Sequence, residues 1–481
     1  MADAGADASE ILAHYFPGAD LRHLDTLSMG SGLFTDAPLW IGLLQNQPEI
    51  TFHIKVGDAE LCFDDSGTCV ATAAEGEKWK FGPDGTGKCS FSRRTGDGGY
   101  IAFEPSGSCS ASAQMPTSDG IFYVPLKGRS YRNGTLRLRE SPLSGRLHLS
   151  VQLAIEDYVR GVQELPDFWP GSSLEAQAVV SRTLAARPLV DYGLAVGFDD
   201  WRLGLCSCHV MDDDPEQSFG GYTAELGHSF WQGRVGATSG MVLAFNNEVI
   251  SARFTSSTGG RTEANEAVGG EALPYLVSVD DTLSLSTAAA NPYVSWVQRF
   301  PRGDLGSVFG FVSLTEVRVS ERNESGSVKS AVLSGIVAGR PTTLVASGGS
   351  IRAALGLHSG YFDVVLFQRF VDVRHGDLFA GEILGLSELG ITSGCTEIRF
   401  CPSDAVTREQ MAAFLVRSLD LDGPEGMDPF VDDDGSIFEA EIETLYHHGI
   451  TTGCTETTFC PTDVVTREEM AAFLIRARSL L

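Results

Sequence analysis

Glu164 is the residue whose surroundings first suggest chemistry. It follows an apolar, helix-like run and directly precedes the aromatic, proline-rich corner LPDFWP at 165–170. Apolar surroundings penalise the charged form of a carboxylic acid, raise its pKa and let it donate a proton near neutral pH. Glu164 is therefore a candidate for a carboxyl group with a raised pKa, with Phe168, Trp169 and the prolines as its apolar wall. The alternative is that Glu164 caps a turn by accepting backbone N–H groups.

A helix and several strands must hold this corner in place. Ser172 followed by Glu175 has the pattern of a capping box, which predicts a helix over 172–187, and a second helix is predicted over 226–236. Gln177 and Arg182 lie to one side of the first helix and need partners if they are buried. Strands are predicted at 39–44, 51–56, 147–154, 240–245 and 364–371. This alternation indicates a mixed α+β fold.

The length and net charge of the chain indicate how many domains to expect and which partners to exclude. A chain of 481 residues is too long for one compact core, so we expect several domains. The formal net charge of −28 repels polyanions at long range, which argues against nucleic acid as a partner. No apolar run reaches the roughly 18–20 residues that cross a bilayer.

The cysteines form neighbouring pairs, as in exported proteins with disulfides. Reduced thiols in a cytosolic enzyme are the alternative. Proximity predicts the pairs Cys62–Cys69, Cys89–Cys109, Cys395–Cys401 and Cys454–Cys460. The loops closed by the last two pairs lack histidines at useful spacing, so disulfides are favoured over zinc there.

The segment LCSCHV leaves two interpretations open. Cys206, Cys208 and His209 could be three zinc ligands, but a disulfide or free thiols are favoured. We favour no metal site and expect no cofactor. The acidic run 212–214 that follows is predicted to be a solvated loop.

The C-terminal end is an internal repeat. Residues 370–417 match 430–476 from Phe370 and Phe430 onward, which indicates two copies of one helix–loop–helix unit. Thr407 with Gln410, and Thr466 with Glu469 in the second copy, predict capping boxes.

These units resemble S-layer homology (SLH) repeats in their Phe-Val-Asp start, Gly-Ile-Thr-x-Gly turn, Phe-x-Pro segment and Val-Thr-Arg-Glu motif. The resemblance implies binding of secondary cell-wall polysaccharide, and an arginine fork suits a carboxylated sugar. It nominates Arg408, Arg467, Gly394 and Gly453. The arginines could instead only pair with nearby glutamates. The chain shows two repeats where three are common.

The central region contains a series of separate motifs in a fixed order: IEDYVRGVQELPDFWPGSSLEAQAVVSRT, QSFGG (217–221), ATSG (237–240), ARFTSSTGGRTE (252–263), PYLVSVDD and IRAALGLHS. This series resembles the SpoIID/LytB family (stage II sporulation protein D). The resemblance implies lytic cleavage of peptidoglycan that leaves a 1,6-anhydromuramyl end, with Glu164 as the catalytic residue. Such an enzyme needs one carboxylate, since a hydroxyl of the substrate is the nucleophile, whereas most hydrolytic glycosidases need two.

Further residues of these motifs are carried over as candidates for either sugar contact or support of the core. They are Gln177, Arg182, Gln217, Ser256, Ser257, Gly259 and Gly260. Thr255 departs from the histidine often found there, so no chemistry is assigned to it.

The N-terminus also resembles family sequence, at SEILAHYFPGADL (9–21). In relatives a Gly-His-Gly segment precedes this block. We therefore expect the natural start to lie upstream and to carry that segment and an export signal, which the first eight residues do not resemble.

Together these observations predict an extracellular, cell-wall-associated protein of α+β fold. Residues 1–365 form a SpoIID-like domain with a β-rich insertion at 40–130 of unassigned role, and all-α SLH repeats follow at 370–420 and 430–481. The expected partners are peptidoglycan glycan strands and wall polysaccharide, with no nucleic acid and no membrane span. The alternative function is a non-catalytic wall-binding protein that assists another hydrolase.

Overall fold

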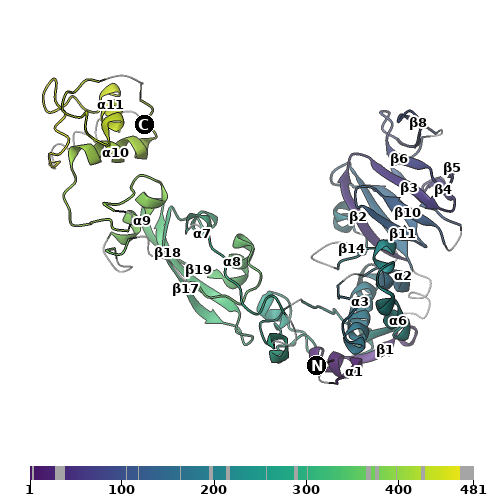
Figure 1. The fold of residues 1–481 in the computed structure, drawn as a ribbon. Helices are drawn as coiled ribbons and strands as arrows, with labels where there is room; N and C mark the ends of the chain where they lie inside the picture. Colours follow the sequence, from purple (N-terminus) through teal and green to yellow (C-terminus); the bar gives the residue numbers. More distant parts are fainter. Residues whose placement is uncertain are drawn as a thin grey trace. The chain divides into compact units, whose positions relative to one another are not determined.

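The computed structural model describes most of the chain in two compact units, 1–289 and 290–481 (Figure 1). The described residues are 1–2, 5–27, 38–103, 106–116, 119–162, 164–193, 199–212, 217–255, 257–286, 291–300, 302–364, 370–373, 379–396, 398–423 and 428–465. The first unit ends inside the segment that the sequence assigned to one domain. The fold is mixed α+β, as predicted. Among the described residues, no helix is long and apolar enough to cross a membrane.

Two antiparallel sheets form most of the first unit. One has the order β11 (Arg129–Arg132), β10 (Ile121–Val124), β3 (Ile50–Val56), β6 (Lys78–Pro83), β7 (Cys89–Arg94) and β8 (Tyr100–Ala102). The other has the order β14 (Val210–Met211), β2 (Leu39–Gln47), β13 (Leu147–Leu153), β12 (Thr135–Glu140), β9 (Ser110–Gln114), β4 (Ala59–Phe63) and β5 (Cys69–Ala73), with β14 parallel to β2. The β-rich region thus extends beyond the predicted 40–130.

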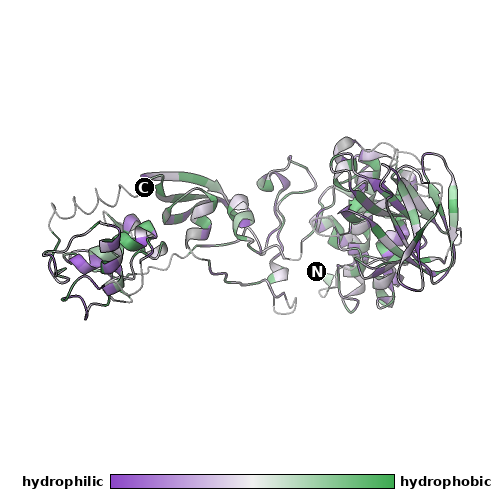
Figure 2. Cartoon of the chain, turned by 90° about the horizontal axis from the view of Figure 1, so that it is seen from above, coloured by the Kyte–Doolittle hydropathy of each residue, from purple (hydrophilic) through white to green (hydrophobic). Residues whose placement is uncertain are grey.

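The two sheets pack face to face around a shared apolar core. Strand β3 alternates between buried and partly exposed residues, as a strand with one buried face must. Phe63 of one sheet lies 5.7 Å from Phe91 and 6.4 Å from Phe81 of the other, measured between ring centroids. In Figure 2, which colours the chain by hydropathy, this unit contains both apolar and polar stretches. The predicted disulfides Cys62–Cys69 and Cys89–Cys109 are confirmed.

Helices and a small sheet complete the first unit. The helices are α1 (Ala8–Tyr15), α2 (Ile155–Arg160), α3 (Gly171–Tyr192), α4 (Asp200–Leu205), α5 (Tyr222–Glu225) and α6 (Ser229–Ala237), with 3-10 turns at Leu24–Thr26, Asn265–Val268 and Thr282–Leu285. The small sheet has the order β1 (Asp20–His23), β15 (Met241–Phe245), β16 (Glu248–Val249). The N-terminal segment is therefore part of this unit, because α1 packs on α3 and β1 pairs with β15.

The helix predicted over 172–187 is present as α3, but its predicted capping box is wrong. Pro170 occupies the N-cap position, and no side chain caps the helix. Glu175 instead forms an ion pair with Arg234 of α6 at 2.7 Å. The ion pair with Arg234 has therefore replaced the capping contact that was predicted between Glu175 and the start of the helix.

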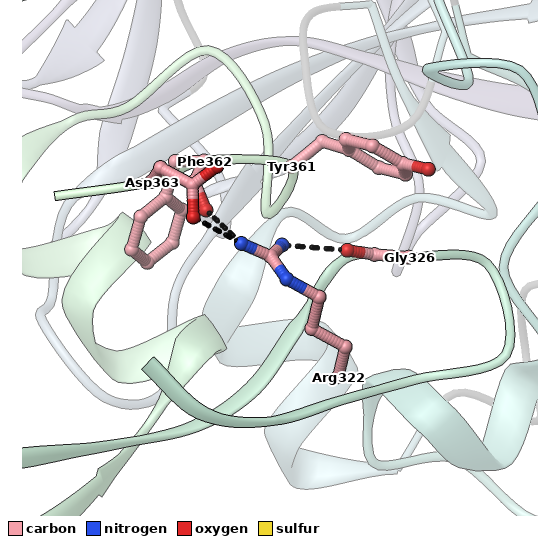
Figure 3. Close-up of a pocket in the computed structure, with 5 residues that line it drawn as sticks. All are labelled: Arg322, Gly326, Tyr361, Phe362 and Asp363. Atoms are coloured by element: carbon pink, nitrogen blue, oxygen red, sulfur yellow. Dashed lines mark hydrogen bonds and ion pairs between the residues drawn. The ribbon is translucent and has the colours of Figure 1, made fainter. Parts of the chain in front are cut away.

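The second unit begins with a three-stranded antiparallel sheet of β17 (Ser313–Arg322), β18 (Val328–Val337) and β19 (Arg340–Ser347), with α7 (Arg302–Val308) and α8 (Gly348–Leu355). Figure 3 shows a pocket beside this sheet that Arg322 enters. The guanidinium of Arg322 donates to the carbonyls of Gly326 and Phe362, at 2.7 and 3.1 Å, and pairs with Asp363. Its charge is thus already compensated, which makes the pocket a poor ligand site.

The repeats contain α9 (Ala380–Glu388), α10 (Arg408–Leu419) and α11 (Glu439–His447). The capping box of Thr407 and Gln410 is confirmed, whereas Thr466 and Glu469 lie outside the described residues. Loops and isolated bridges, such as Thr407 with Val464, separate the helices, so the all-α description is not established. The predicted disulfides Cys395–Cys401 and Cys454–Cys460 are confirmed. Most of the strand predicted at 364–371 also lies outside the described residues.

Candidate active site

Glu164 lies just after α2, where the chain pairs with a distant segment. Val162 forms a bridge with Phe219, and the N–H of Gly220 donates to the carbonyl of Gly161 at 2.8 Å. The N–H of Ser218 donates to Oε1 of Glu164 at 2.6 Å. Glu164 itself is half-buried. A backbone amide therefore fixes one oxygen of a carboxylate that remains partly accessible.

Two predicted residues, Gln177 and Gln217, are linked through the hydroxyl of Ser181. Gln217 is 2% exposed, and its Nε2 donates to Oγ of Ser181 at 2.6 Å. Gln177 donates to the same Oγ at 3.2 Å, and the hydroxyl of Tyr158 donates to Oε1 of Gln217 at 2.9 Å. These four residues form a buried polar network across α2, α3 and the 217–220 segment. Since Ser218 follows Gln217, the network positions the amide that holds Glu164.

Phe168 does not form part of the predicted apolar wall. Phe168 is 85% exposed, so its ring is not buried against other residues, whereas Trp169 is 38% exposed and therefore mostly covered. The prediction that Phe168 desolvates Glu164 is therefore wrong. Asp167 instead organises this loop, since its carboxylate accepts N–H groups of Phe230 and Trp231 in the first turn of α6, at 3.2 and 2.6 Å.

Arg182 supports the core. It is fully buried and forms a two-point ion pair with Glu156, at 2.7 and 3.0 Å. Glu156 also accepts the N–H of Gly240 at 2.9 Å. The pair thus ties α2 and α3 to the turn before β15. Of the two roles left open for Arg182, the structure favours support over sugar contact.

The serine- and glycine-rich loop is tied to the N-terminal helix. The hydroxyls of Thr258 and Tyr15 donate to opposite oxygens of Asp281, at 2.6 and 2.5 Å. Burial, and then the Asp281 contact, raise the pKa of Tyr15. Gly259 and Gly260 have φ of +74° and +104°, a backbone region that suits glycine. Ser257 is half-buried, and Ser256 lies outside the described residues.

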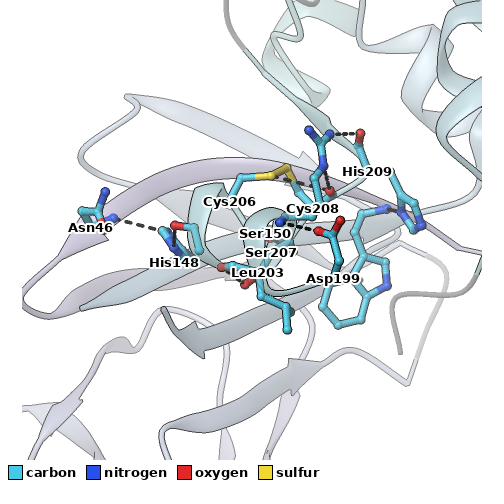
Figure 4. The surroundings of a disulfide bond; sticks show 12 residues. Asn46, His148, Ser150, Asp199, Leu203, Cys206, Ser207, Cys208 and His209 are labelled. Carbon is cyan, nitrogen blue, oxygen red and sulfur yellow. Dashed lines mark hydrogen bonds between the residues drawn. A yellow bond between two sulfur atoms is a disulfide. The ribbon is translucent and has the colours of Figure 1, made fainter. Parts of the chain in front are cut away.

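Cys206 and Cys208 form a buried disulfide against β2 (Figure 4). Nδ1 of His209 accepts the N–H of Trp40 and its Nε2 donates to the carbonyl of Gly193, both at 2.9 Å. Burial is the main cause that lowers the pKa of His209 to about 4. With both sulfurs bonded to each other and both ring nitrogens engaged, these residues offer no set of metal ligands in this form.

The prediction of a solvated acidic loop is wrong at Asp212. Its side chain is 1% exposed and lies 2.9 Å from Nζ of Lys127 and 3.6 Å from Nη1 of Arg129. Arg129 also donates to the carbonyl of Phe219 at 2.8 Å. Asp212 is therefore held by two basic residues at the edge of the packed sheets, and one of them, Arg129, also contacts the 217–220 segment. The other two acids of the run lie outside the described residues.

The residues nominated for wall-polymer binding shape the repeats. A Cβ at Gly394 or Gly453 would lie 2.3 Å from a carbonyl oxygen of the same loop, so both positions require glycine. Arg408 is 5% exposed, donates to the carbonyl of Phe459 at 2.9 Å and covers that ring. It thus connects the first repeat to the second. Arg467 lies outside the described residues.

Sequence reasoning missed Tyr158, Ser181 and Ser218 as parts of the site. Each lies inside a quoted motif, but a hydroxyl or a backbone N–H carries little signal about its partner. The spacing of Ser181 four residues after Gln177 on one helix is the signal that could have linked those two.

Two family models match parts of the chain. Residues 144–245 match the family model for stage II sporulation protein (SpoIID), and residues 429–471 match that for the S-layer homology domain. The first match spans Glu164, Gln177 and Gln217, and the second covers the whole described part of the second repeat, residues 430–465.

Three curated relatives are similar over parts of the chain. Stage II sporulation protein D of Bacillus subtilis is 29% identical over 30% of this chain and 45% of its own length. The amidase enhancer of the same organism is 29% identical over 28% of this chain and 15% of its own length. An endoglucanase of a Bacillus species is 36% identical over 23% of this chain and 12% of its own length. The chain thus covers less than half of each of these relatives.

Proposed function

We propose that this chain, which carries a SpoIID domain and a C-terminal SLH domain, is a cell-wall-associated protein that cleaves the glycan strands of peptidoglycan. One observation carries the proposal. Glu164 is a half-buried carboxylate fixed by the Ser218 amide, beside the Gln177–Ser181–Gln217–Tyr158 network. The segments that meet there lie within the matched family region.

One carboxylate suits a lytic transglycosylase mechanism. Protonated Glu164 donates its proton to the glycosidic oxygen, and the bond from that oxygen to the muramic acid carbon breaks. The resulting carboxylate then takes a proton from the carbon-6 hydroxyl of the same sugar, whose oxygen bonds to that carbon. The new end is a 1,6-anhydro sugar, and no water is consumed. The hydrogen bond from Ser218 fixes the carboxyl group through both proton transfers.

Location at the wall is the second part of the proposal. Five disulfides suit an oxidising compartment outside the cell. The SLH domain supports attachment to wall polysaccharide. In this account Gly394, Gly453 and Arg408 shape the loops that form the binding surface, and Arg467 is the candidate for direct contact with an acidic sugar.

A non-catalytic helper is the second candidate function. It is favoured by the likeness to a protein named amidase enhancer and by the contact between Glu164 and a backbone N–H. In that account the same surface binds glycan and presents it to a separate hydrolase.

Incubation of purified protein with peptide-free and intact glycan strands tests the proposal, with products identified by mass spectrometry. Wild type and Glu60→Gln, a control at an exposed acid of β4, should both release fragments, and Glu164→Gln should not. Glycan binding without cleavage by all three proteins would instead support the helper.

A further inference from the structure

Asp433 is a buried acidic residue whose carboxylate has no hydrogen-bond partner among the described residues. It is 1% exposed, and within the described part of the chain neither oxygen of its carboxylate has a hydrogen-bond partner. A buried charge is costly unless it is paired, hydrogen-bonded or coordinated to a metal. Asp433 therefore needs either a proton or a cation that the described residues do not supply.

The first repeat provides a direct comparison for this position. Asp372 accepts the N–H groups of Phe400 and Cys401, and Asp432 accepts the corresponding groups of Phe459 and Cys460, so these two aspartates are structural equivalents. The next residue is Val373 in the first repeat and Asp433 in the second.

Val373 is 3% exposed and packs with Phe370 and Ile383 in an apolar cluster. The second repeat thus has a carboxylate at the position where the first repeat has an apolar core side chain. The fold of a repeat does not require an acid at this position, so the acid calls for another explanation.

Other carboxylates surround Asp433. One ligand oxygen each of Asp428, Asp433 and Asp434 can be chosen so that all lie within 4.8 Å of one another. Glu439 in the first turn of α11 and Glu443 one turn later add negative charge. Burial first, and then acids that include Asp428 and Glu439, raise the pKa of Asp433.

We propose that Asp428, Asp433 and Asp434 bind a calcium ion. All the ligands are carboxylate oxygens, which hard divalent cations prefer. Ca–O distances of about 2.3–2.6 Å place opposite ligands of one ion up to about 5 Å apart, which matches the spread of these atoms. Glu439 and Glu443 strengthen the site through their charge. The inference is independent of the proposed glycan cleavage.

The ion has a structural consequence for the second repeat. The carbonyl of Asp433 accepts the N–H of Ser436 at 2.8 Å, and the side chain of Ser436 accepts the N–H of Phe438 at 3.1 Å, just before α11 begins. Ile442 and Leu445 of α11 are fully buried in the core of this repeat. Calcium binding thereby fixes the turn that docks α11, and it stabilises the second repeat.

Calorimetric titration of the chelator-treated full chain with Ca²⁺ tests this site. Wild type should bind one Ca²⁺ and show a higher Tm when Ca²⁺ is added. Asp433→Val, which installs the residue of the first repeat, should lose the binding heat and the Tm shift. Its Tm in chelator should equal or exceed that of wild type. Asp422→Asn, at an exposed acid near α10, should behave as wild type.

A second variant guards against loss of folding. The double variant Asp428→Asn, Asp434→Asn keeps Asp433 but should weaken Ca²⁺ binding at least about tenfold. If Asp433 is simply protonated, wild type will show no binding heat and no calcium-dependent Tm shift, which overturns the proposal. Equal Ca²⁺ responses in wild type and Asp433→Val would overturn it as well.

Discussion

Glu164 and Asp433 are both acids within folded units, but their surroundings differ in two respects. Glu164 is half-buried and held by a neutral amide, next to neutral glutamine, serine and tyrosine side chains. Asp433 is fully buried among other acids and has no hydrogen-bond partner in the described residues. The first setting keeps a carboxyl group oriented and reachable, as proton transfer requires. The second calls for a cation. The comparison indicates that the charge and hydrogen-bonding groups around a carboxyl group, more than its burial, decide whether it can transfer a proton or bind a cation.

The largest expected effect is on catalysis at Glu164. Glu164→Gln keeps the shape and the hydrogen bond to Ser218 but removes the titrating proton, so we expect cleavage to fall by about 10²–10⁴-fold or more. Initial rates of fragment release from peptide-free glycan measure this loss. A variant that retains wild-type rates would remove Glu164 from the mechanism.

Val373→Asp tests whether the first repeat tolerates an acid at the position that Asp433 occupies in the second repeat. It places an acid at the twin position of Asp433, where Phe370 and Ile383 provide an apolar environment. We expect the free energy of unfolding of the second unit to fall by about 3 kcal/mol or more, since a buried unpaired charge is strongly destabilising.

Denaturant unfolding, with Val373→Thr as a control that inserts a neutral polar group, measures this effect. An unchanged midpoint for Val373→Asp would mean that the position tolerates charge by itself. Asp433 would then need no cation either.

His209 extends the comparison to a buried base that is fully paired. Its folded-state pKa is about 4, below its ordinary value near 6.5, so the folded state prefers the neutral ring. The stabilisation is fully present above about pH 6.5 and is lost as pH falls toward about 4, because the unfolded chain takes up the proton first. The loss should reach about 3 kcal/mol.

The pH dependence of unfolding of the first unit measures this effect. His209→Gln should show a shallower slope between pH 6.5 and 4 than wild type. Identical slopes would contradict the assignment, and Ser130→Ala, at a half-buried polar residue of β11, serves as a control.

The smallest expected effect concerns the network behind Glu164. Tyr158→Phe removes one hydrogen bond to Gln217 and should lower the free energy of unfolding by about 1 kcal/mol, with a several-fold loss of cleavage rate. The kcat should fall more than KM changes, since the network positions a catalytic group. Equal stability and rate would show that this network does not hold the site.

Much of this architecture could be predicted from sequence. Alternating strands, the α3 helix, the capping box at Thr407 and the neighbouring disulfides depend on local patterns, and the structure contains them. Errors arose where distant partners override local preference. Glu175 forms an ion pair with Arg234 instead of capping α3. Asp212 is buried and forms ion pairs with Lys127 and Arg129 instead of lying in a solvated loop.

The candidate site was predictable in its residues but less so in its environment. Gln177 and Gln217 share the hydroxyl of Ser181, and Glu164 accepts the amide of Ser218, the residue after Gln217. Phe168 is nevertheless exposed, because nothing in the sequence of a proline-rich loop fixes which way its rings point. An alignment of the two repeats already shows that Asp433 occupies the position of Val373. The sequence does not show that both side chains are buried, and an acid at this position is unusual only because it is buried.

The most direct test of the central claim is the mass of the new muramic acid end released by wild type. Our account predicts an anhydro end, one water lighter than a reducing end, because the carbon-6 hydroxyl attacks and Glu164 serves as both acid and base. Reducing ends that incorporate ¹⁸O from labelled water would instead show hydrolysis and contradict the single-carboxylate mechanism.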